Sequence, residues 1–169
     1  MNASIDLIVE DDRWRQALPE LEAVAVEAAA MAVGGAGVGV GCEVSILACD
    51  DAAIAGLNRQ FRQKDGPTNV LSWPSEDLSP GRPGGAPGLP EPGPSGPPVF
   101  LGDLALALET CRAEAESADI PLKFHVRHLI LHGCLHLLGY DHVADEDAAL
   151  MEGIESRLLT KAGYPDPYA

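Results

Sequence analysis

All five histidines of this 169-residue chain lie between His125 and His142. His132 and His136 are four positions apart in a segment with helical periodicity, so their imidazoles lie on one helix face, one turn apart. At that separation two ring nitrogens can reach one ion at ~2.0–2.1 Å. Gly139 can end the helix through a left-handed residue and return His142 as a third ligand. The spacing therefore predicts a metal site of three histidines.

Three neutral nitrogens with a vacant fourth position are typical of a catalytic zinc site, with one Zn²⁺ per chain. The H-x-x-x-H-x-x-G-x-x-H spacing is that of the metzincin proteases, in which a Glu general base follows the first His. Gly133 occupies that position here, which argues against proteolysis. A structural zinc normally has four protein ligands, but Cys134 is predicted to point to the opposite helix face and to pack there.

The other polar residues near this motif are less defined. His128 lies on the same stripe as His132, and we interpret it as a supporting or packing residue rather than a fourth ligand. His125 receives no role. Asp141 could orient a ligand or be a solvated turn residue, and the sequence favours neither.

Arg59, Arg62 and Lys64 form the densest basic patch in a chain that has 11 Lys and Arg residues and a net charge of −15. The acidic balance argues against broad, sequence-independent binding to a polyanion. Arg59 and Arg62 share a helix face, and a guanidinium offers paired donors that match a phosphate. A solvated helix face is the alternative interpretation of the same residues.

The periodicity predicts a single α/β (α+β) domain over residues 1–169: a small mixed four-stranded sheet packed with about five helices, with the metal site on a central helix. The predicted strands are 4–9, 43–48, 69–73 and 99–108, with a possible bulge at Gly102-Asp103. The predicted helices are 19–33, one that Asp50 or Asp51 caps and that runs to about 62, 109–118, 121–138 and 145–161. Pro19 is placed in the first turn of its helix, and Gly34-Gly35 is placed at its end.

Residues 74–98 interrupt this pattern with nine prolines and six glycines. We expect a disordered loop inserted within the domain, because such a segment buries too little surface to offset its ordering entropy. The chain shows no signal peptide, no apolar stretch of membrane-spanning length and no C-x-x-C pair. These features predict a cytoplasmic protein with reduced, packed cysteines.

Three sequence blocks together resemble the YbeY family of bacterial ribosomal RNA maturation factors. They are L-N-R-Q-F-R-Q-K-D-G-P-T-N-V-L-S-W-P at 57–74, L-G-D-L-A at 101–105 and H-G-C-L-H-L-L-G-Y-D-H at 132–142. They occur in the family's order, and the similarity covers roughly 43–161. Trp73 replaces the more usual Phe, and the insertion before Leu101 is longer than expected.

The resemblance implies a single-strand-specific endoribonuclease that acts in 16S ribosomal RNA 3′-end maturation and in ribosome quality control. It implies zinc bound by His132, His136 and His142, and an essential catalytic Arg62. The implied partners are single-stranded RNA, as the 16S precursor, and the small ribosomal subunit with its proteins. Neither DNA nor a membrane is an expected partner. Arg59, Arg62 and Lys64 are the predicted substrate-binding residues.

Two other functions are compatible with the same residues. One is another metal-dependent hydrolase that acts on a peptide or small molecule, against which Gly133 and the basic patch both argue. The other is a non-catalytic, zinc-containing ribosome assembly factor, whose acidic surface could dock basic ribosomal proteins.

Overall fold

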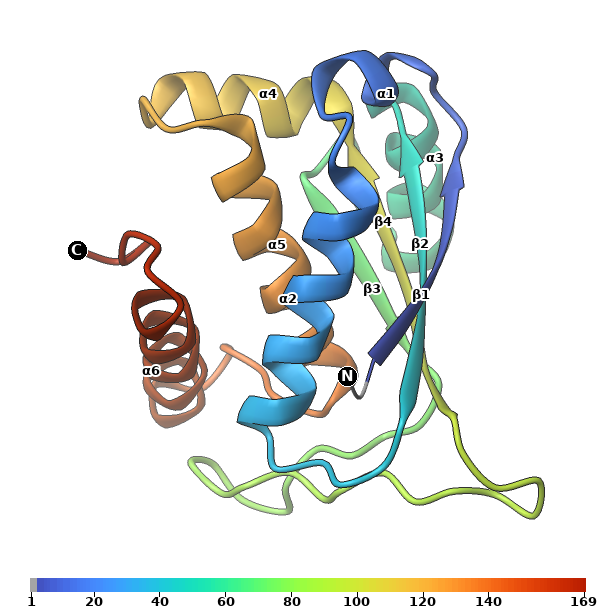
Figure 1. The fold of residues 1–169 in the computed structure, drawn as a ribbon, viewed down its shortest axis with the longest axis vertical. Helices are drawn as coiled ribbons and strands as arrows, with labels where there is room; N and C mark the ends of the chain where they lie inside the picture. The colour runs from blue at the N-terminus through green and yellow to red at the C-terminus, as the bar shows by residue number, and fades with distance from the viewer. Residues whose placement is uncertain (1–2) are drawn as a thin grey trace.

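The computed structural model describes residues 3–169 as a mixed sheet with helices on both faces (Figure 1). The strands lie in the order β1-β2-β4-β3; β1, β2 and β4 are parallel, and β3 is antiparallel to β4. This arrangement confirms the predicted mixed four-stranded sheet. The strands are β1 (Ala3–Val9), β2 (Cys42–Cys49), β3 (Val70–Pro74) and β4 (Val99–Ala107).

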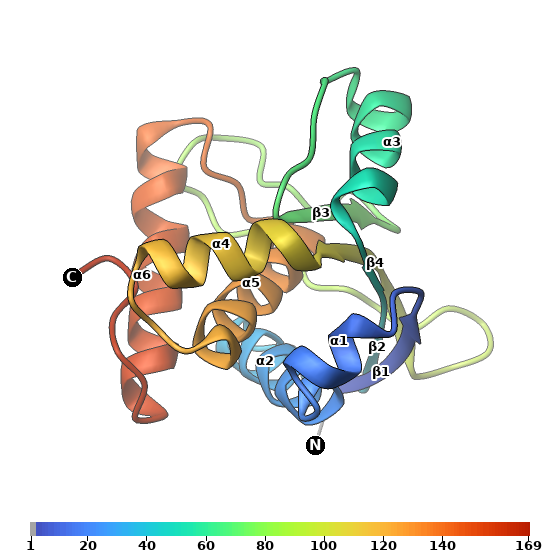
Figure 2. The same ribbon diagram turned by 90° about the horizontal axis from the view of Figure 1, so that it is seen from above.

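Helices α2 and α5 cover one face of the sheet, α6 lies outside them, and α3 lies on the opposite face (Figures 1 and 2). Within residues 3–169, no helix is both long and apolar enough to cross a membrane. The described chain has six helices against the roughly five predicted. They are α1 (Arg13–Ala17), α2 (Leu21–Gly35), α3 (Asp51–Arg62), α4 (Leu108–Ser117), α5 (Leu122–Leu137) and α6 (Asp145–Lys161).

The additional helix is α1, a single turn that is too short to show apolar periodicity in the sequence. Its Trp14 is fully buried, and the indole Nε1–H donates to the carbonyl oxygen of Cys49 at 2.8 Å. Burial of this one large side chain, with its polar atom satisfied, attaches the helix to the end of β2.

The sheet buries apolar side chains on both faces. Val44 and Ile46 of β2 belong to the main core beneath α2 and α5. Ala105 and Ala107 of β4 belong to a smaller cluster on the other face, together with Ile54 of α3. β4 has one extra residue where it pairs with β2, and Gly102, at φ 141°, comes directly after it. The predicted bulge is therefore present.

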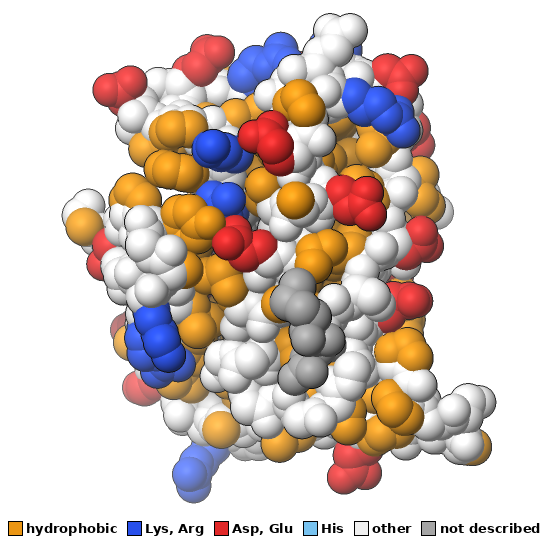
Figure 3. Space-filling view, viewed as in Figure 1, with side chains coloured by type: hydrophobic (Ala, Val, Ile, Leu, Met, Phe, Trp, Pro, Cys, Tyr) orange, Lys and Arg blue, Asp and Glu red, His pale blue; other side chains and the backbone are white. Residues whose placement is uncertain are grey.

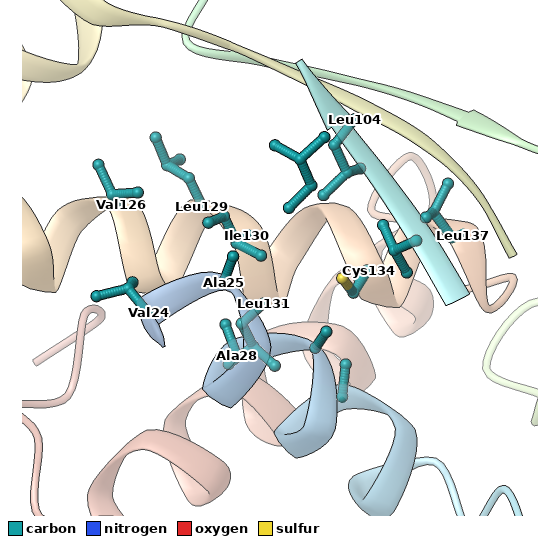
Figure 4. Close-up of a cluster of buried hydrophobic side chains, with 14 of the residues drawn as sticks. Val24, Ala25, Ala28, Leu104, Val126, Leu129, Ile130, Leu131, Cys134 and Leu137 are labelled. Carbon is teal, nitrogen blue, oxygen red and sulfur yellow. The ribbon is translucent and has the colours of Figure 1, made fainter. Parts of the chain in front are cut away.

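Helix α5 lies in the middle of the main core (Figure 4). Its Ile130, Leu131 and Cys134 are fully buried, as are Ala25 and Ala28 of the neighbouring α2. Small side chains on α2 let the two helices approach closely, and each large apolar side chain buried there contributes roughly 1.5–3 kcal/mol. Cys134 therefore packs in the core as predicted, and burial raises the pKa of its thiol to about 12.

Both predicted ends of α2 were wrong by two residues. The helix begins at Leu21, so Pro19 precedes it instead of occupying its first turn. It also continues through Gly35, and the positive φ of 75° falls on Gly37. A Cβ on Gly35 would lie 2.6 Å from Cδ1 of Leu158 in α6. Gly35 therefore lets α6 pack closely against α2, and it does not end α2.

Residues 75–98 form irregular chain along one end of the molecule (Figure 1). Leu78 is buried, and the backbone N–H of Gly84 donates to Asp147 of α6 at 2.8 Å. Leu78 also lies against Gly139, where an added Cβ would be 2.7 Å from the Leu78 carbonyl. The start of this segment therefore packs beside the end of α5, while its disorder stays a prediction.

Two helical glycines differ in their surroundings, and this difference predicts opposite responses to alanine. A Cβ on Gly133 of α5 would lie 2.8 Å from Cδ2 of buried Leu104, whereas Gly153 of α6 has no neighbour within 4 Å. Alanine gains up to ~1 kcal/mol of helix propensity at either site. At Gly133 an overpacking cost of ~1–3 kcal/mol opposes that gain.

We therefore expect Gly133→Ala to be ~1–3 kcal/mol less stable than Gly153→Ala. Urea denaturation of both variants in the presence of a chelator measures the difference without a contribution from bound metal. Equal free energies of unfolding would contradict the close packing of α5 on β4.

Candidate metal centre

The end of α5 brings the third histidine back to the first two. Gly139 has a φ of 101°, and its N–H donates to the His136 carbonyl oxygen, while the Tyr140 N–H donates to Leu135. This left-handed ending reverses the chain within three residues. One ligand atom each from His132, His136 and His142 then lies within 4.8 Å of the others. The structure thus brings together the three predicted ligands.

Hydrogen bonds fix which nitrogen of each helical histidine is free. Nδ1 of His136 lies 3.0 Å from the carbonyl oxygen of Tyr140, which can only accept, so this nitrogen carries the proton. Nδ1 of His132 donates in the same way to the carboxylate of Glu155 at 3.3 Å. In the neutral rings both Nε2 atoms are therefore unprotonated, and they face each other at 3.0 Å.

This geometry fits a shared cation. Two lone pairs at 3.0 Å repel each other unless a positive charge lies between them. A tetrahedral ion at ~2.0–2.1 Å from each nitrogen would hold them roughly 3.3 Å apart, a few tenths of an ångström from the observed separation. Burial, followed by the neighbouring His132, lowers the pKa of His136 to about 4. The ring is thus neutral at physiological pH, which is the form that binds metal.

A fourth coordination position would face a cavity of about 1140 Å³. No other His, Cys, Asp or Glu in residues 3–169 joins the three-histidine group. His142 is exposed, whereas His132 and His136 are half-buried, so the open side of the group lies toward solvent and the cavity. Three protein ligands and an accessible fourth position suit a reactive metal better than a structural one.

Glu155 of α6 contacts this group and was missed by the sequence analysis. Its side chain is fully buried and accepts from His128 Nε2 at 2.6 Å as well as from His132. Burial alone would raise the pKa of Glu155, but the hydrogen bonds from both imidazoles outweigh it and hold the pKa at about 2. The sequence feature that could have identified Glu155 is its place in the apolar stripe of α6, between Ile154 and Leu158.

His125 belongs to a second hydrogen-bonded group that lines the same cavity. Its Nε2 lies 2.8 Å from Oε1 of Glu114 in α4, and the Asn69 side-chain amide donates to the same oxygen at 3.0 Å. This group joins α4, α5 and the start of β3 roughly 10 Å along α5 from His132. His128 lies between the two groups and faces Glu155, outside the three-histidine cluster.

The predicted basic residues are divided between the cavity and the outer surface. Arg62 and Lys64 line the cavity, whereas Arg59 does not. Arg62 is in the last turn of α3 and donates to the carbonyl oxygen of Ser72 in β3. This bond holds one side of the guanidinium and leaves its other N–H groups for a ligand.

A left-handed Gln63, at φ 57°, ends α3 and starts the turn toward β3. Buried Asn58 donates to the Gly66 carbonyl oxygen at 3.0 Å and holds this turn. The connection therefore places Arg62 in the lining of the cavity that the histidines also line. Asp50 caps the other end of α3, as one of the two predicted caps, by accepting from the Ala53 N–H at 2.8 Å.

The charged residues that line the cavity are more acidic than basic. Arg62 and Lys64 are the basic ones among the described residues, and the acidic ones are Glu76, Asp77, Glu114 and Asp141. A divalent cation at the histidines would bring the formal charge of this lining to zero. Over the face shown in Figure 3, outside the grey residues, basic and acidic side chains are interspersed without a continuous basic surface.

Comparison with known proteins identifies relatives over nearly the whole chain. The family described as Endoribonuclease YbeY matches residues 8–163. Proteins named Endoribonuclease YbeY from Ruegeria pomeroyi and Dinoroseobacter shibae are each 53% identical and align with 98% of this chain, over 98% and 91% of their own lengths. The protein of that name from Cereibacter sphaeroides is 48% identical over 99% of this chain and all of its own.

A solution structure of a protein from Thermotoga maritima has a similar fold, with a TM-score of 0.52 at 18% identity over 98% of this chain and 99% of that one. The sequence similarity covers the histidine motif, the Arg62 region and the strands between them. The chain belongs to the YbeY family of endoribonucleases.

Proposed function

We propose that this protein is a zinc-dependent endoribonuclease, specific for single-stranded RNA, that acts in 16S ribosomal RNA 3′-end maturation and ribosome quality control. Membership of an endoribonuclease family supports the reaction class. The observation that carries the proposal is that Arg62 and three imidazoles able to hold a metal line one open cavity. A set of three imidazole ligands is one that zinc commonly takes among the divalent metals.

The shape of the cavity suits a strand of nucleic acid. It follows α5 from His125 to His136, a length of roughly 16 Å at 1.5 Å per residue. Its volume of about 1140 Å³ lies above the range of a pocket for one small molecule. A cavity of this length, lined by residues of α5 and β3, accommodates a short stretch of a single strand.

His132, His136 and His142 would hold the zinc, which when bound supplies a Lewis acid for a phosphoryl oxygen and a means of activating water. Arg62 binds the phosphate with its free N–H groups and stabilises the charge that develops on it. Its bond to Ser72 keeps the guanidinium oriented before substrate arrives. Lys64 neutralises a neighbouring phosphate, and Arg59 makes an outer contact with the strand.

The net charge of −15 makes unassisted capture of RNA weak, and this supports delivery of the substrate by a partner. In this proposal the small ribosomal subunit and its proteins present the 3′ end of the 16S precursor to the groove. The protein acts in the cytoplasm, where ribosomes mature, and uses neither DNA nor a membrane.

The purified protein should contain about one zinc per chain, and His136→Ala should lose it because two ligands hold zinc poorly. His125→Ala is the matched control, since His125 is on the same helix but outside the three-histidine group. Elemental analysis after gel filtration measures the stoichiometry. Zinc that persists in His136→Ala, or disappears in His125→Ala, would place the metal elsewhere.

Arg62→Ala should slow cleavage of a defined single-stranded RNA by about 10²–10³-fold, the usual effect of removing one donor to a developing charge. Arg59→Ala, three residues earlier on α3, should change the rate by less than about 10-fold because Arg59 lies outside the cavity. Single-turnover rates with saturating protein separate these effects. Equal losses of cleavage rate in Arg62→Ala and Arg59→Ala, or full activity in Arg62→Ala, would contradict the role assigned to Arg62.

A further inference from the structure

We propose that Glu155 is a positioning residue for the metal centre: it fixes His132 in the tautomer and ring orientation that direct Nε2 toward the metal. This inference rests on the proposed zinc site. His128 and Tyr168 hold the carboxylate in place from two other directions. Glu155 itself stays outside the three-histidine group.

Three donors converge on the Glu155 carboxylate. His132 Nδ1 lies 3.3 Å from Oε1 and 3.4 Å from Oε2, so it faces both oxygens. His128 Nε2 lies 2.6 Å from Oε1, and the Tyr168 hydroxyl donates to the same oxygen at 3.0 Å. The two imidazoles come from α5 and the phenol comes from the C-terminal tail, so Glu155 joins three separate segments.

A buried carboxylate at this position is costly for the fold. Glu155 has no exposed surface, and none of its hydrogen-bond partners in residues 3–169 is a Lys or Arg. Its neighbours on the same stripe of α6, Met151 and Ile154, are apolar core residues. An apolar side chain would pack there without the desolvation penalty of a charge. Packing therefore does not account for a carboxylate here, and we attribute its presence to its action on the imidazoles that it contacts.

That effect follows from the chemistry of imidazole. A neutral ring carries its proton on either nitrogen, and an acceptor at Nδ1 selects the form whose Nε2 can bind metal. A carboxylate acceptor also makes Nε2 a stronger ligand, and loss of such a partner typically weakens metal binding 10–100-fold. The neutral carbonyl oxygen of Tyr140 selects the same tautomer of His136, at 3.0 Å from its Nδ1.

The C-terminal tail closes over this arrangement. Asp166 accepts from the Ser156 hydroxyl at 2.7 Å and from the Tyr168 N–H at 2.9 Å, which folds the tail back onto α6. The Tyr168 ring packs edge-on against His128, with centroids 5.6 Å apart. Tyr168 therefore covers Glu155 and restricts the positions that the carboxylate can adopt.

The test is the zinc affinity of the purified chain, measured by competition with a chromophoric chelator. Glu155→Gln should bind zinc 10–100-fold more weakly than the wild type. Glu152→Gln is the matched control, because it removes the same charge from the same helix at a residue without a hydrogen bond to the histidines. It should leave the zinc affinity unchanged. Tyr168→Phe should weaken binding less than Glu155→Gln, since the bond to His132 remains.

Nitrogen NMR of the zinc-free proteins provides a readout that packing alone would not move. The wild type should show His132 protonated at Nδ1, and Glu155→Gln should show a mixture of the two tautomers. Equal zinc affinity of Glu155→Gln and the wild type would overturn the positioning role and leave the zinc site standing. A wild type that binds no zinc would overturn both.

If Glu155→Gln fails to fold, Tyr168→Phe decides the question. Its zinc affinity should fall by a measurable factor of about 2–10, because the carboxylate loses one of its three donors. An unchanged zinc affinity in a folded Tyr168→Phe would overturn the inference.

Discussion

The site depends on the rigid burial of one helix. Helix α5 packs Ile130, Leu131 and Cys134 into the core between α2 and the sheet, and this fixes the rotation of the helix about its axis. His132 and His136 are then held on the opposite side, one turn apart. Because 3.6 residues complete a turn, the apolar stripe and the histidine stripe cannot move independently. Core packing therefore sets the separation of two candidate metal ligands.

Electrostatics explain how an acidic protein can act on RNA. The cavity lining has more carboxylates than basic groups, so a polyanion gains little from it without a cation. In the proposed function, the metal both neutralises the lining and contributes to the reaction, while Arg62 supplies directional donors. Binding to RNA is then confined to the site of chemistry, and the acidic remainder of the surface is left for protein partners.

The sequence determined the elements well where periodicity was strong. The alternation in β2 and the helical stripes of α3, α5 and α6 predicted those elements to within about one residue, because burial of a continuous apolar face sets both their type and their extent. The one-turn α1 has no such stripe, and the glycines at the end of α2 looked like a stop. Only the approach of Leu158 from α6 showed why Gly35 is helical.

The site, like the fold, was predicted from the sequence only where local geometry determines it. His132, His136 and His142 could be predicted because helical spacing and a glycine turn act within eleven residues, so local geometry determines their meeting. The position of Arg62 in the cavity lining, the placement of Arg59 outside it and the burial of Glu155 against His132 depend on contacts between elements distant in the chain. Such contacts result from how α3, α5 and α6 pack on the sheet, which no local pattern encodes. The sequence thus determined the three candidate ligands, and the tertiary structure decided what surrounds and orients them.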